Sequence, residues 1–596
     1  MATNDRSTTW GAHLINNGYA HFRLWAPAHH APAVEIDGNA VAMDPEADGW
    51  FGVTVQAAPG ARYQFMLPDG TRVPDPAANA QHGDVHGPSL LVDHDAYQWR
   101  NAQWQGRPWE EAVIYELHIG TFTEEGTFAA AAKRVEYLAS LGITAVEIMP
   151  VAQFGGTRGW GYDGVLPYAP HNAYGSPDDM KAFIDACHDH GLMVLLDVVY
   201  NHFGPDGNYL SSYAPDFFDD AHHTPWGAAI AYAREPVRKF FIDNALYWLR
   251  DYRLDGLRLD AIDQVRDEKS DEELLVAIAR TIRKEFPDRH IHLTTEDNRN
   301  VTYLHERSQD GKVQLYTGEW NDDFHNVCHV IATGETDGYY EDFAEDVWAM
   351  LARSLAEGFI YQGETSTHMG SEPRGKPSIH LPPTSFVNFL QNHDQTGNRA
   401  LGERLTELAD RRDLEMLQAI LLLSPAIPLV FMGEEFGETR PFLFFTDFTG
   451  ELADAVREGR RKEFAHFASH QGETVPDPNA RETFEQSKLD WKRLEAPEGR
   501  AELARFQRLL DLRKRCIVPL LGQAGGNSGR ILTVTDGVIA VDWQLGEKLL
   551  QLRCNFTETG QTVPETTGEC IFSYPDEPKS GSDRDQPPKS LRFCLA

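Results

Sequence analysis

An alternation between strand-like apolar runs and helix-length amphipathic stretches constrains this chain more than any other feature. It begins near Glu111 and is typical of a parallel α/β domain. Eight apolar runs can be distinguished, at residues 112–122, 145–151, 192–202, 256–261, 291–298, 313–320, 385–394 and 427–437. Eight strand–helix repeats predict a (β/α)8 TIM barrel, an α/β fold, with loops inserted between its elements.

Local signals mark the ends of the expected helices. The stretch TFAAAAKRVEYLASLG, residues 127–142, predicts a helix that ends at Gly142, because glycine suits a helix C-terminal cap. Another helix is expected to begin at Ser176 as N-cap, followed by Pro177 in the first turn. Residues 503–515 predict the last helix of the barrel.

Both flanks of the barrel are rich in strand signals. Residues 1–96 contain short alternating runs broken by Pro, Gly and Asp, which predicts an immunoglobulin-like β-sandwich. Residues 517–596 predict a small antiparallel β domain, which leaves 97–516 for the barrel. The N-terminal module either binds sugar or packs against the barrel, and we favour packing.

The charge balance narrows the choice of partner. With 54 basic and 90 acidic residues the net charge is −36, which argues against nucleic acid or an anionic membrane as a partner and is compatible with a neutral sugar. The six cysteines show no metal-ligand spacing, and neither a secretory signal nor a membrane-spanning run is found. We therefore expect a cytoplasmic protein, monomer or homodimer, that acts on a small oligosaccharide without a cofactor.

Polar side chains stand at the ends of four predicted strands. They are Asp197 with His202, Arg258 with Asp260, Glu296 alone, and His393 with Asp394. Any one of them has a structural explanation, such as a turn cap or a half-buried histidine. A closed barrel, however, brings its strand ends together at the C-terminal mouth, where TIM-barrel enzymes have their active sites.

The pair Arg258 and Asp260 predicts an ionised carboxylate. The two residues share one side of a strand, so the guanidinium group lowers the pKa of the carboxyl group by charge and hydrogen bonding. Such a carboxylate can attack an electrophilic carbon at neutral pH. Two carboxyl groups that flank one bond are what glycoside hydrolysis requires, roughly 5–5.5 Å apart in the retaining mechanism.

Four segments carry a family resemblance. DVVYNH (197–202), GLRLDA (256–261), the strand ending in TTED with Glu296, and FLQNHD (389–394) resemble the four motif regions of the α-amylase superfamily of glycoside hydrolases, in order and in strand placement. The resemblance implies a retaining mechanism on α-glucans. Asp260 would be the nucleophile, Glu296 the acid/base, and Asp394 the residue that grips two hydroxyl groups of the sugar and stabilises the transition state.

The same resemblance implies how the sugar is bound in the −1 subsite. Arg258 would orient and ionise Asp260, while His202 and His393 would hydrogen-bond the sugar. Tyr162, in GWGYDG (159–164), resembles the tyrosine that stacks beneath it. Asp197 would brace the site.

Longer segments suggest which member of the superfamily this is. Residues 155–210 resemble both glycogen branching enzymes and maltooligosyltrehalose trehalohydrolases, whereas 318–326 and 441–448 resemble the trehalohydrolases more closely. The expected activity is therefore cleavage of the α-1,4 bond next to the terminal trehalosyl unit of maltooligosyltrehalose. A glucan-branching transferase and a non-catalytic glucan-binding barrel are the alternatives.

The aglycone side departs from ordinary amylases. Many of them carry Lys-His shortly after the nucleophile, where this chain has Ile262-Asp263. We hypothesise that the α,α-1,1-linked glucose is recognised by Asp263, Asn321, Asp322 and His325; the alternative is that 320–325 only shapes a loop. Some amylases hold calcium after the third strand, but the Asp-rich segment 206–220 lacks EF-hand spacing, and no required metal is expected.

Overall fold

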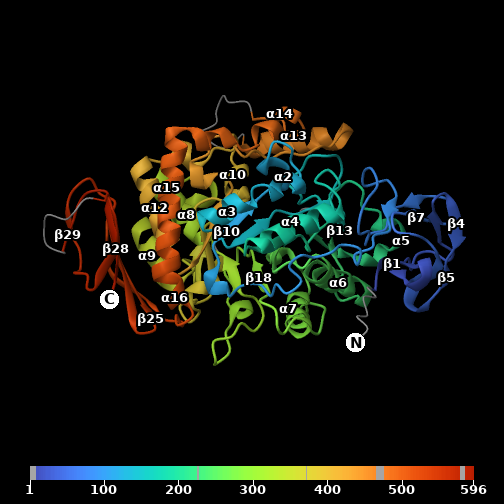
Figure 1. The fold of residues 1–596 in the computed structure, drawn as a ribbon, viewed down its shortest axis with the longest axis horizontal. Helices are drawn as coiled ribbons and strands as arrows, with labels where there is room; N and C mark the ends of the chain where they lie inside the picture. Colours follow the sequence, from blue (N-terminus) through green and yellow to red (C-terminus); the bar gives the residue numbers. More distant parts are fainter. Residues whose placement is uncertain (1–8, 225–226, 369, 371, 465–474, 577–583) are drawn as a thin grey trace.

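The computed structural model describes residues 9–224, 227–368, 370, 372–464, 475–576 and 584–596. A closed parallel barrel forms the middle of the molecule, with antiparallel sheets at its two ends (Figure 1). Its strands, in order around the barrel, are β10 (Ile114–Leu117), β11 (Ala145–Ile148), β14 (Met193–Val198), β17 (Gly256–Leu259), β18 (His292–Thr295), β19 (Gly318–Trp320), β22 (Phe386–Phe389) and β23 (Ile427–Phe431).

The predicted (β/α)8 barrel is therefore confirmed, and each strand lies within one of the eight predicted runs. The barrel closes because β23 pairs in parallel with both β22 and β10. The strands are only three to six residues long. The predicted runs are longer because their last residues already belong to the loops at the mouth of the barrel.

Apolar side chains fill the lower part of the barrel interior. Ile114, Met193, Leu195, Val387 and Leu429, which come from four strands, belong to one buried cluster. Burial on both sheet faces explains why these strands read as continuous apolar runs.

Helices cover the outside of the barrel, among them α4 (Pro177–Asp189), α6 (Glu235–Asp251), α7 (Leu274–Glu285), α12 (Arg411–Leu423) and α15 (Pro497–Leu512). Ser176 caps α4 in a reciprocal capping box with Asp179, as its position predicts. The single helix predicted over 127–142 is wrong: a break at Lys133 and Arg134 divides it into α2 (Phe128–Ala132) and α3 (Val135–Leu141).

Two antiparallel sheets form the N-terminal region. One contains β1 (Gly11–Ile15), β2 (Tyr19–Trp25), β6 (Trp50–Gln56) and β5 (Asp44–Pro45); the other contains β4 (Asn39–Ala42), β3 (Ala33–Ile36), β7 (Arg62–Met66) and β8 (Arg72–Val73), with β9 (Ser89–Leu90) also paired to β7. Trp10 joins this region to the barrel, since its ring contacts Phe240 of α6 and its indole N–H donates to the carbonyl oxygen of Pro236 over 2.8 Å.

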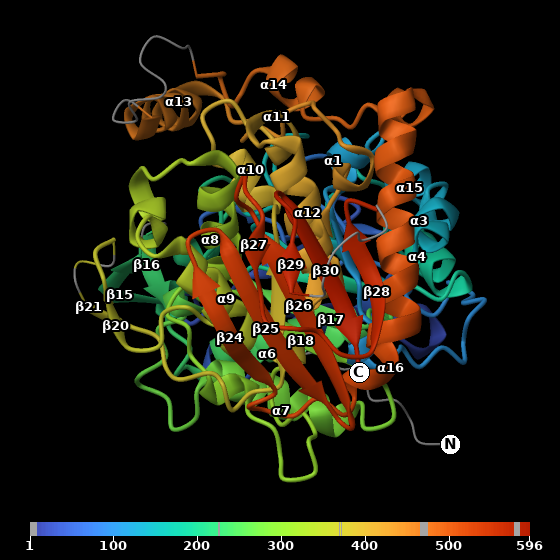
Figure 2. The same cartoon turned by 90° about the vertical axis from the view of Figure 1, so that its left-hand side faces the viewer.

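A five-stranded antiparallel sheet forms the C-terminal region and faces the viewer in Figure 2. Its strands are β24 (Gly529–Thr535), β25 (Val538–Leu545), β26 (Lys548–Asn555), β30 (Ser590–Leu595) and β28 (Glu569–Tyr574). Trp543 lies against helix α9 (Val347–Glu357) and donates its indole N–H to the carbonyl oxygen of Leu355 over 2.8 Å. The helical part of the chain continues through α16 (Val518–Leu521) before this sheet begins.

Long excursions follow β14 and β19. The first contains the hairpin β15 (Phe218–Thr224) and β16 (Gly227–Ile230). The second contains α8 (Asp322–Thr333), α9 and the hairpin β20 (Glu364–Ser366) and β21 (Glu372–Arg374). No disulfide bond joins any of the six cysteines, and no described helix is long and apolar enough to cross a membrane.

Candidate active site

One guanidinium group, that of Arg258, joins three of the predicted carboxylates at the barrel mouth. Its Nη1 donates to Oδ1 of Asp260 over 2.8 Å and to Oδ2 of Asp197 over 2.7 Å. Its Nη2 lies 3.5 Å from Oε2 of Glu296. Arg258 is 1% exposed and its guanidinium carbon lies 4.2 Å from the centre of the Trp320 ring, so its position is firmly held. Asp260 and Glu296 therefore belong to a single charged cluster.

Glu296 follows β18 directly and is held by the residue after Asp260. The backbone N–H of Ala261 donates to Oε2 of Glu296 over 2.6 Å. Burial raises the pKa of the Glu296 carboxyl well above its ordinary value; Arg258 opposes the shift, and the charges of Asp260, Asp322 and Asp394 add to it. A carboxyl group with a raised pKa keeps its proton near neutral pH, as a general acid must.

The backbone at Ala261 is what directs this N–H toward Glu296. Ala261 has φ 40° and ψ 55°, a left-handed conformation that few non-glycine residues adopt. Strained backbone of this kind is concentrated at functional sites, where the surrounding structure maintains it.

Asp197 and Asn201 hold the cluster from below and from the side. Asn201 donates its amide N–H to Oδ2 of Asp260 over 3.1 Å. Tyr162 donates its hydroxyl to Oδ2 of Asp197 over 2.5 Å. Burial raises the pKa of Asp197 to about 6, while Arg258 opposes the shift. Asp197 contacts Arg258 rather than the cavity, which is the position of a bracing residue.

His393 lies between the stacking tyrosine and a buried acid. Its ring stacks on that of Tyr162, with the centres 5.0 Å apart, and its Nδ1 lies 2.5 Å from Oε1 of Glu116. Burial alone would lower the pKa of His393, but Glu116 and Asp394 together outweigh it, so the net shift is upward. His202 is also buried and its Nε2 lies 3.0 Å from the carbonyl oxygen of Tyr162; burial lowers its pKa.

Asp394 is the most exposed of the three predicted catalytic acids. Its side chain is 47% exposed, compared with 13% for Asp260 and 19% for Glu296. The amide of Asn398 donates to its Oδ1 over 2.7 Å. Nε2 of His393 lies 3.9 Å from the same oxygen, which links Asp394 to the cluster below it.

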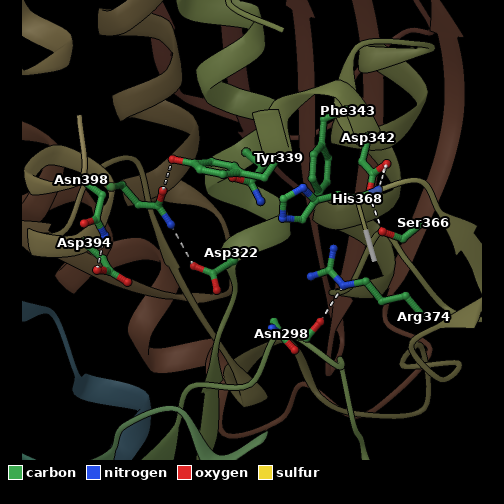
Figure 3. A pocket seen from close by; sticks show the side chains of 12 residues that line it. Asn298, Asp322, Tyr339, Asp342, Phe343, Ser366, His368, Arg374, Asp394 and Asn398 are labelled. Atoms are coloured by element: carbon green, nitrogen blue, oxygen red, sulfur yellow. Dashed lines mark hydrogen bonds between the residues drawn. The ribbon is translucent and has the colours of Figure 1, made fainter. Parts of the chain in front are cut away.

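A cavity of about 210 Å³ opens beside Asp394 (Figure 3). Its walls come from segments after β18, β19 and β22, and its lining includes Asn298, Asp322, Tyr339, Arg374 and Gln395. In Figure 3 Asp322 and Asp394 both point into this space. Its size and polar walls suit a carbohydrate, whose hydroxyl groups need hydrogen-bond partners on several sides.

The four residues predicted for the aglycone side lie in different surroundings. Asp322 lines the cavity, accepts a hydrogen bond from Gln395 over 3.2 Å, and has its pKa raised to about 6 by burial and by Asp394. Asp263 is 9% exposed and outside the cavity lining, and burial raises its pKa.

Asn321 and His325 are buried and engaged within the protein. Asn321 donates to Oδ1 of Asn388 over 2.9 Å, and Nδ1 of His325 lies 2.7 Å from the carbonyl oxygen of Leu390. Burial lowers the pKa of His325 well below its ordinary value. Neither side chain lines the cavity, so of the four predicted residues the geometry favours Asp322.

The sequence reasoning did not single out several residues that support the site. Asn201 lies near the end of the predicted strand 192–202, and Glu116 is an acid in the middle of the apolar run 112–122, so the position of each was a usable signal. Arg374, Tyr339 and Gln395 had no such signal, because they come from short elements between the barrel strands and helices that are too short to show an apolar period. Among the described residues there is no group of three or more His, Cys, Asp or Glu side chains arranged to hold a metal ion.

Comparison with known proteins identifies relatives along nearly the whole chain. The pattern described as "Alpha amylase, catalytic domain" matches residues 101–216 and 223–493. A malto-oligosyltrehalose trehalohydrolase of Deinococcus radiodurans is 42% identical over 578 residues, covering 95% of this chain and 94% of that one. One of Saccharolobus solfataricus is 40% identical, with coverages of 81% and 84%.

Solved structures agree at the level of the fold. A candidate alpha amylase of Salmonella typhimurium is 54% identical, with a TM-score of 0.96, and the alignment covers 99% of this chain and 100% of that one. A pullulanase of Paenibacillus barengoltzii, at 18% identity and a TM-score of 0.72, shares the fold. In the sequence comparison, a glucan branching enzyme of Vibrio parahaemolyticus is 35% identical, and the alignment covers 42% of this chain and 38% of that enzyme.

Proposed function

Because the chain belongs to the malto-oligosyltrehalose trehalohydrolases of the α-amylase family, we propose that it hydrolyses the α-1,4 bond next to the terminal trehalosyl unit of maltooligosyltrehalose. The products are trehalose and a maltooligosaccharide. The observation that carries the proposal is the pair Asp260 and Glu296, which face one guanidinium group at the mouth of the barrel.

In the first step the glycosidic bond breaks with help from both acids. Glu296 gives its proton to the glycosidic oxygen while the carboxylate of Asp260 attacks the anomeric carbon. Trehalose leaves, and the maltooligosaccharide stays attached to Asp260 as a β-glucosyl ester. The raised pKa of Glu296 supports this role, because the group must hold its proton until the bond breaks.

In the second step water resolves the ester. Glu296, now a carboxylate, takes a proton from a water molecule, whose oxygen attacks the anomeric carbon from the face that trehalose left. Asp260 is released as a carboxylate and Glu296 is protonated again. The two inversions leave the product with the α configuration of the substrate.

Other residues position the sugar whose bond is broken. Asp394 is exposed enough to bind two of its hydroxyl groups, and Tyr162 offers a ring for stacking. His202 and His393 are assigned hydrogen bonds to the same sugar. Arg258 orients the side chain of Asp260 by donating a hydrogen bond to its Oδ1.

On the trehalose side we assign the recognition of the second glucose to Asp322, with Asp263, Asn321 and His325 as the remaining candidates. Asp322 alone of the four lines the cavity. Asp322→Ala should raise KM for maltooligosyltrehalose, while His325→Ala, a change in the packed interior, should act through stability instead. If trehalose release is unchanged in both variants, the assignment fails.

We further propose that the protein works in the cytoplasm on a dissolved oligosaccharide, as a monomer or homodimer. The six cysteines form no disulfide bond with one another, which agrees with a reducing compartment.

Product analysis after incubation with maltooligosyltrehalose tests the proposal. Free trehalose should be a main product, and Asp260→Asn should abolish its release while retaining sugar binding. With amylose, a branching transferase would change iodine staining without producing much reducing sugar. That result, in the absence of trehalose release, would replace the hydrolase with a transferase.

A further inference from the structure

A layer of polar side chains lies inside the barrel directly beneath the catalytic acids. Glu116 of β10 pairs in register with Glu147 of β11. Asp197 of β14 pairs with Arg258 of β17, which pairs with Thr294 of β18. Residues in register on parallel strands face the same side of the sheet, so these side chains share the barrel interior. Trp320 of β19 belongs to the layer through its contact with Arg258.

Five of these side chains carry buried polar atoms without a hydrogen-bond partner among the described residues. The atoms are Oε1 and Oε2 of Glu147, Oδ1 of Asp197, Nε of Arg258, Oγ1 of Thr294 and Nε1 of Trp320. None of the five residues is more than 3% exposed. Buried polar atoms are nearly always hydrogen-bonded, so their gathering in one layer requires an explanation.

Ordered water fits the chemistry of these atoms. Arg258 and Trp320 offer N–H donors, Asp197 offers an acceptor, and the Thr294 hydroxyl can do either. A buried water molecule makes about three hydrogen bonds, usually to polar groups that lack a protein partner. The layer supplies donors and acceptors in the mixture that such water needs.

Glu147 has no role in the mechanism proposed above. It faces Glu116 on β10, Asp197 on β14 and Arg258 on β17, and no other charged group is found to act on it. Burial first, and then the charges of Asp197 and Glu116, raise the pKa of Glu147 well above its ordinary value, although Arg258 opposes them. A neutral carboxyl group offers one O–H donor and acceptor oxygens to the same water.

We propose that Glu147 is a positioning residue, which anchors ordered water beneath the catalytic acids and thereby holds Asp197 and Arg258 in place. Arg258 reaches Asp260 and Glu296 through its two terminal nitrogens, so a rotation of its side chain alters both contacts at once. Residues that do not touch the substrate themselves can affect activity in this way, because they orient the groups that do touch it.

The first test is a high-resolution crystal structure of the wild-type protein, which needs no substrate. Water within hydrogen-bonding distance of Glu147 and of Thr294 or Asp197 supports the inference. An interior without water, in which Glu147 bonds to protein atoms alone, overturns it.

The second test is kinetic and rests on the proposed function, because it follows trehalose release. Glu147→Gln retains a neutral hydrogen-bonding group and should keep kcat within about threefold of wild type. Glu147→Leu removes that group at similar volume and should lower kcat by about 10-fold to 100-fold. Its pH profile should also differ from that of wild type, because a misplaced Arg258 loses its contacts with the carboxyl groups of both Asp260 and Glu296.

Matched variants separate positioning from a general loss of packing. Met193→Leu changes an apolar side chain in the lower part of the same barrel and should leave the pH profile unchanged. Thr294→Val removes one hydroxyl at constant volume and should move kcat in the same direction as Glu147→Leu. It keeps the test decisive if Glu147→Leu does not fold.

The outcomes are distinguishable. If wild-type protein releases no trehalose, the proposed function fails and the crystallographic test still decides this inference. If wild type is active and Glu147→Leu matches it in kcat and pH profile, the inference fails alone. Equal losses in Glu147→Gln and Glu147→Leu also contradict it, because they would mean that the residue acts through a negative charge.

Discussion

At the scale of single residues, the chemistry depends on how neighbours divide two carboxyl groups into different roles. Asp260 receives hydrogen bonds from Arg258 and Asn201, whereas Glu296 is buried among other acids and has a raised pKa. A carboxyl group that accepts hydrogen bonds from a cation suits the role of nucleophile, and a carboxyl group with a raised pKa suits the role of acid.

Glu296→Gln should lower kcat by about 10²–10⁴-fold, the usual contribution of a general acid/base. Since the pKa of Glu296 is raised, wild-type activity should persist through neutral pH and fall at alkaline pH, where the carboxyl loses its proton. The variant should lack this alkaline limb. A pH series of kcat/KM measures both effects; an alkaline limb retained in the variant would assign it to another group.

Substitutions at Ala261 test the strained backbone beside the nucleophile. Ala261→Gly should keep activity, because glycine adopts a left-handed conformation readily and still offers the N–H that binds Glu296. Ala261→Val should lose activity, because a branched side chain disfavours this conformation. Trehalose release measures the effect of each substitution on activity, and the melting temperature measures its effect on stability. Similar activity in both variants would show that the left-handed conformation of residue 261 does not matter.

At the scale of elements, the sequence was sufficient for the barrel and for the acids at its strand ends. A buried parallel strand needs an unbroken apolar run, and a polar residue at its end stands out, which is why the positions of Asp260 and Glu296 could be predicted. The break between α2 and α3 could not, because the apolar spacing continues through Lys133 and Arg134.

The cavity walls were beyond sequence reasoning for a different reason. They depend on contacts between loops that lie far apart in the chain. Asp323, at the start of α8, accepts N–H groups from Ile360 and Tyr361 and pairs with Arg374 of β21 at 3.0 Å. Arg374 in turn donates to the carbonyl oxygen of Asn298 over 2.6 Å. No periodic pattern encodes such a network.

Asp323→Asn should therefore weaken the cavity wall as well as the fold. Removing one partner of a buried ion pair costs about 3–5 kcal/mol, and both side chains are less than 9% exposed. We expect a clear drop in the melting temperature and a higher KM. Asp310→Asn, which breaks the exposed pair with Lys312, is the control and should leave the melting temperature close to that of wild type. Equal effects of the two substitutions would contradict this role for Asp323.

At the scale of the whole molecule, the two terminal sheet regions lie at opposite ends of the barrel (Figure 1). Each is fastened to it by a buried tryptophan, Trp10 at one end and Trp543 at the other. Neither contact touches the cavity beside Asp394.

Trp10→Ala should therefore destabilise the protein without changing its chemistry. Truncating a fully buried tryptophan costs about 3–5 kcal/mol. Unfolding should occur at lower temperature or denaturant concentration, while kcat measured well below the transition stays within about twofold of wild type. A large loss of kcat in the folded variant would instead connect the N-terminal region to catalysis.

The bridging position of Arg258 has a consequence for how charge moves during turnover. In the proposed mechanism, the anion beside its Nη1 before bond cleavage is Asp260, and Glu296 beside Nη2 carries the proton. In the glycosyl-enzyme Asp260 becomes an ester and Glu296 an anion, so the negative charge passes from one end of the guanidinium group to the other. A delocalised cation can follow that transfer without any movement of the chain, whereas the compact ammonium group of a lysine would have to swing between the two sites.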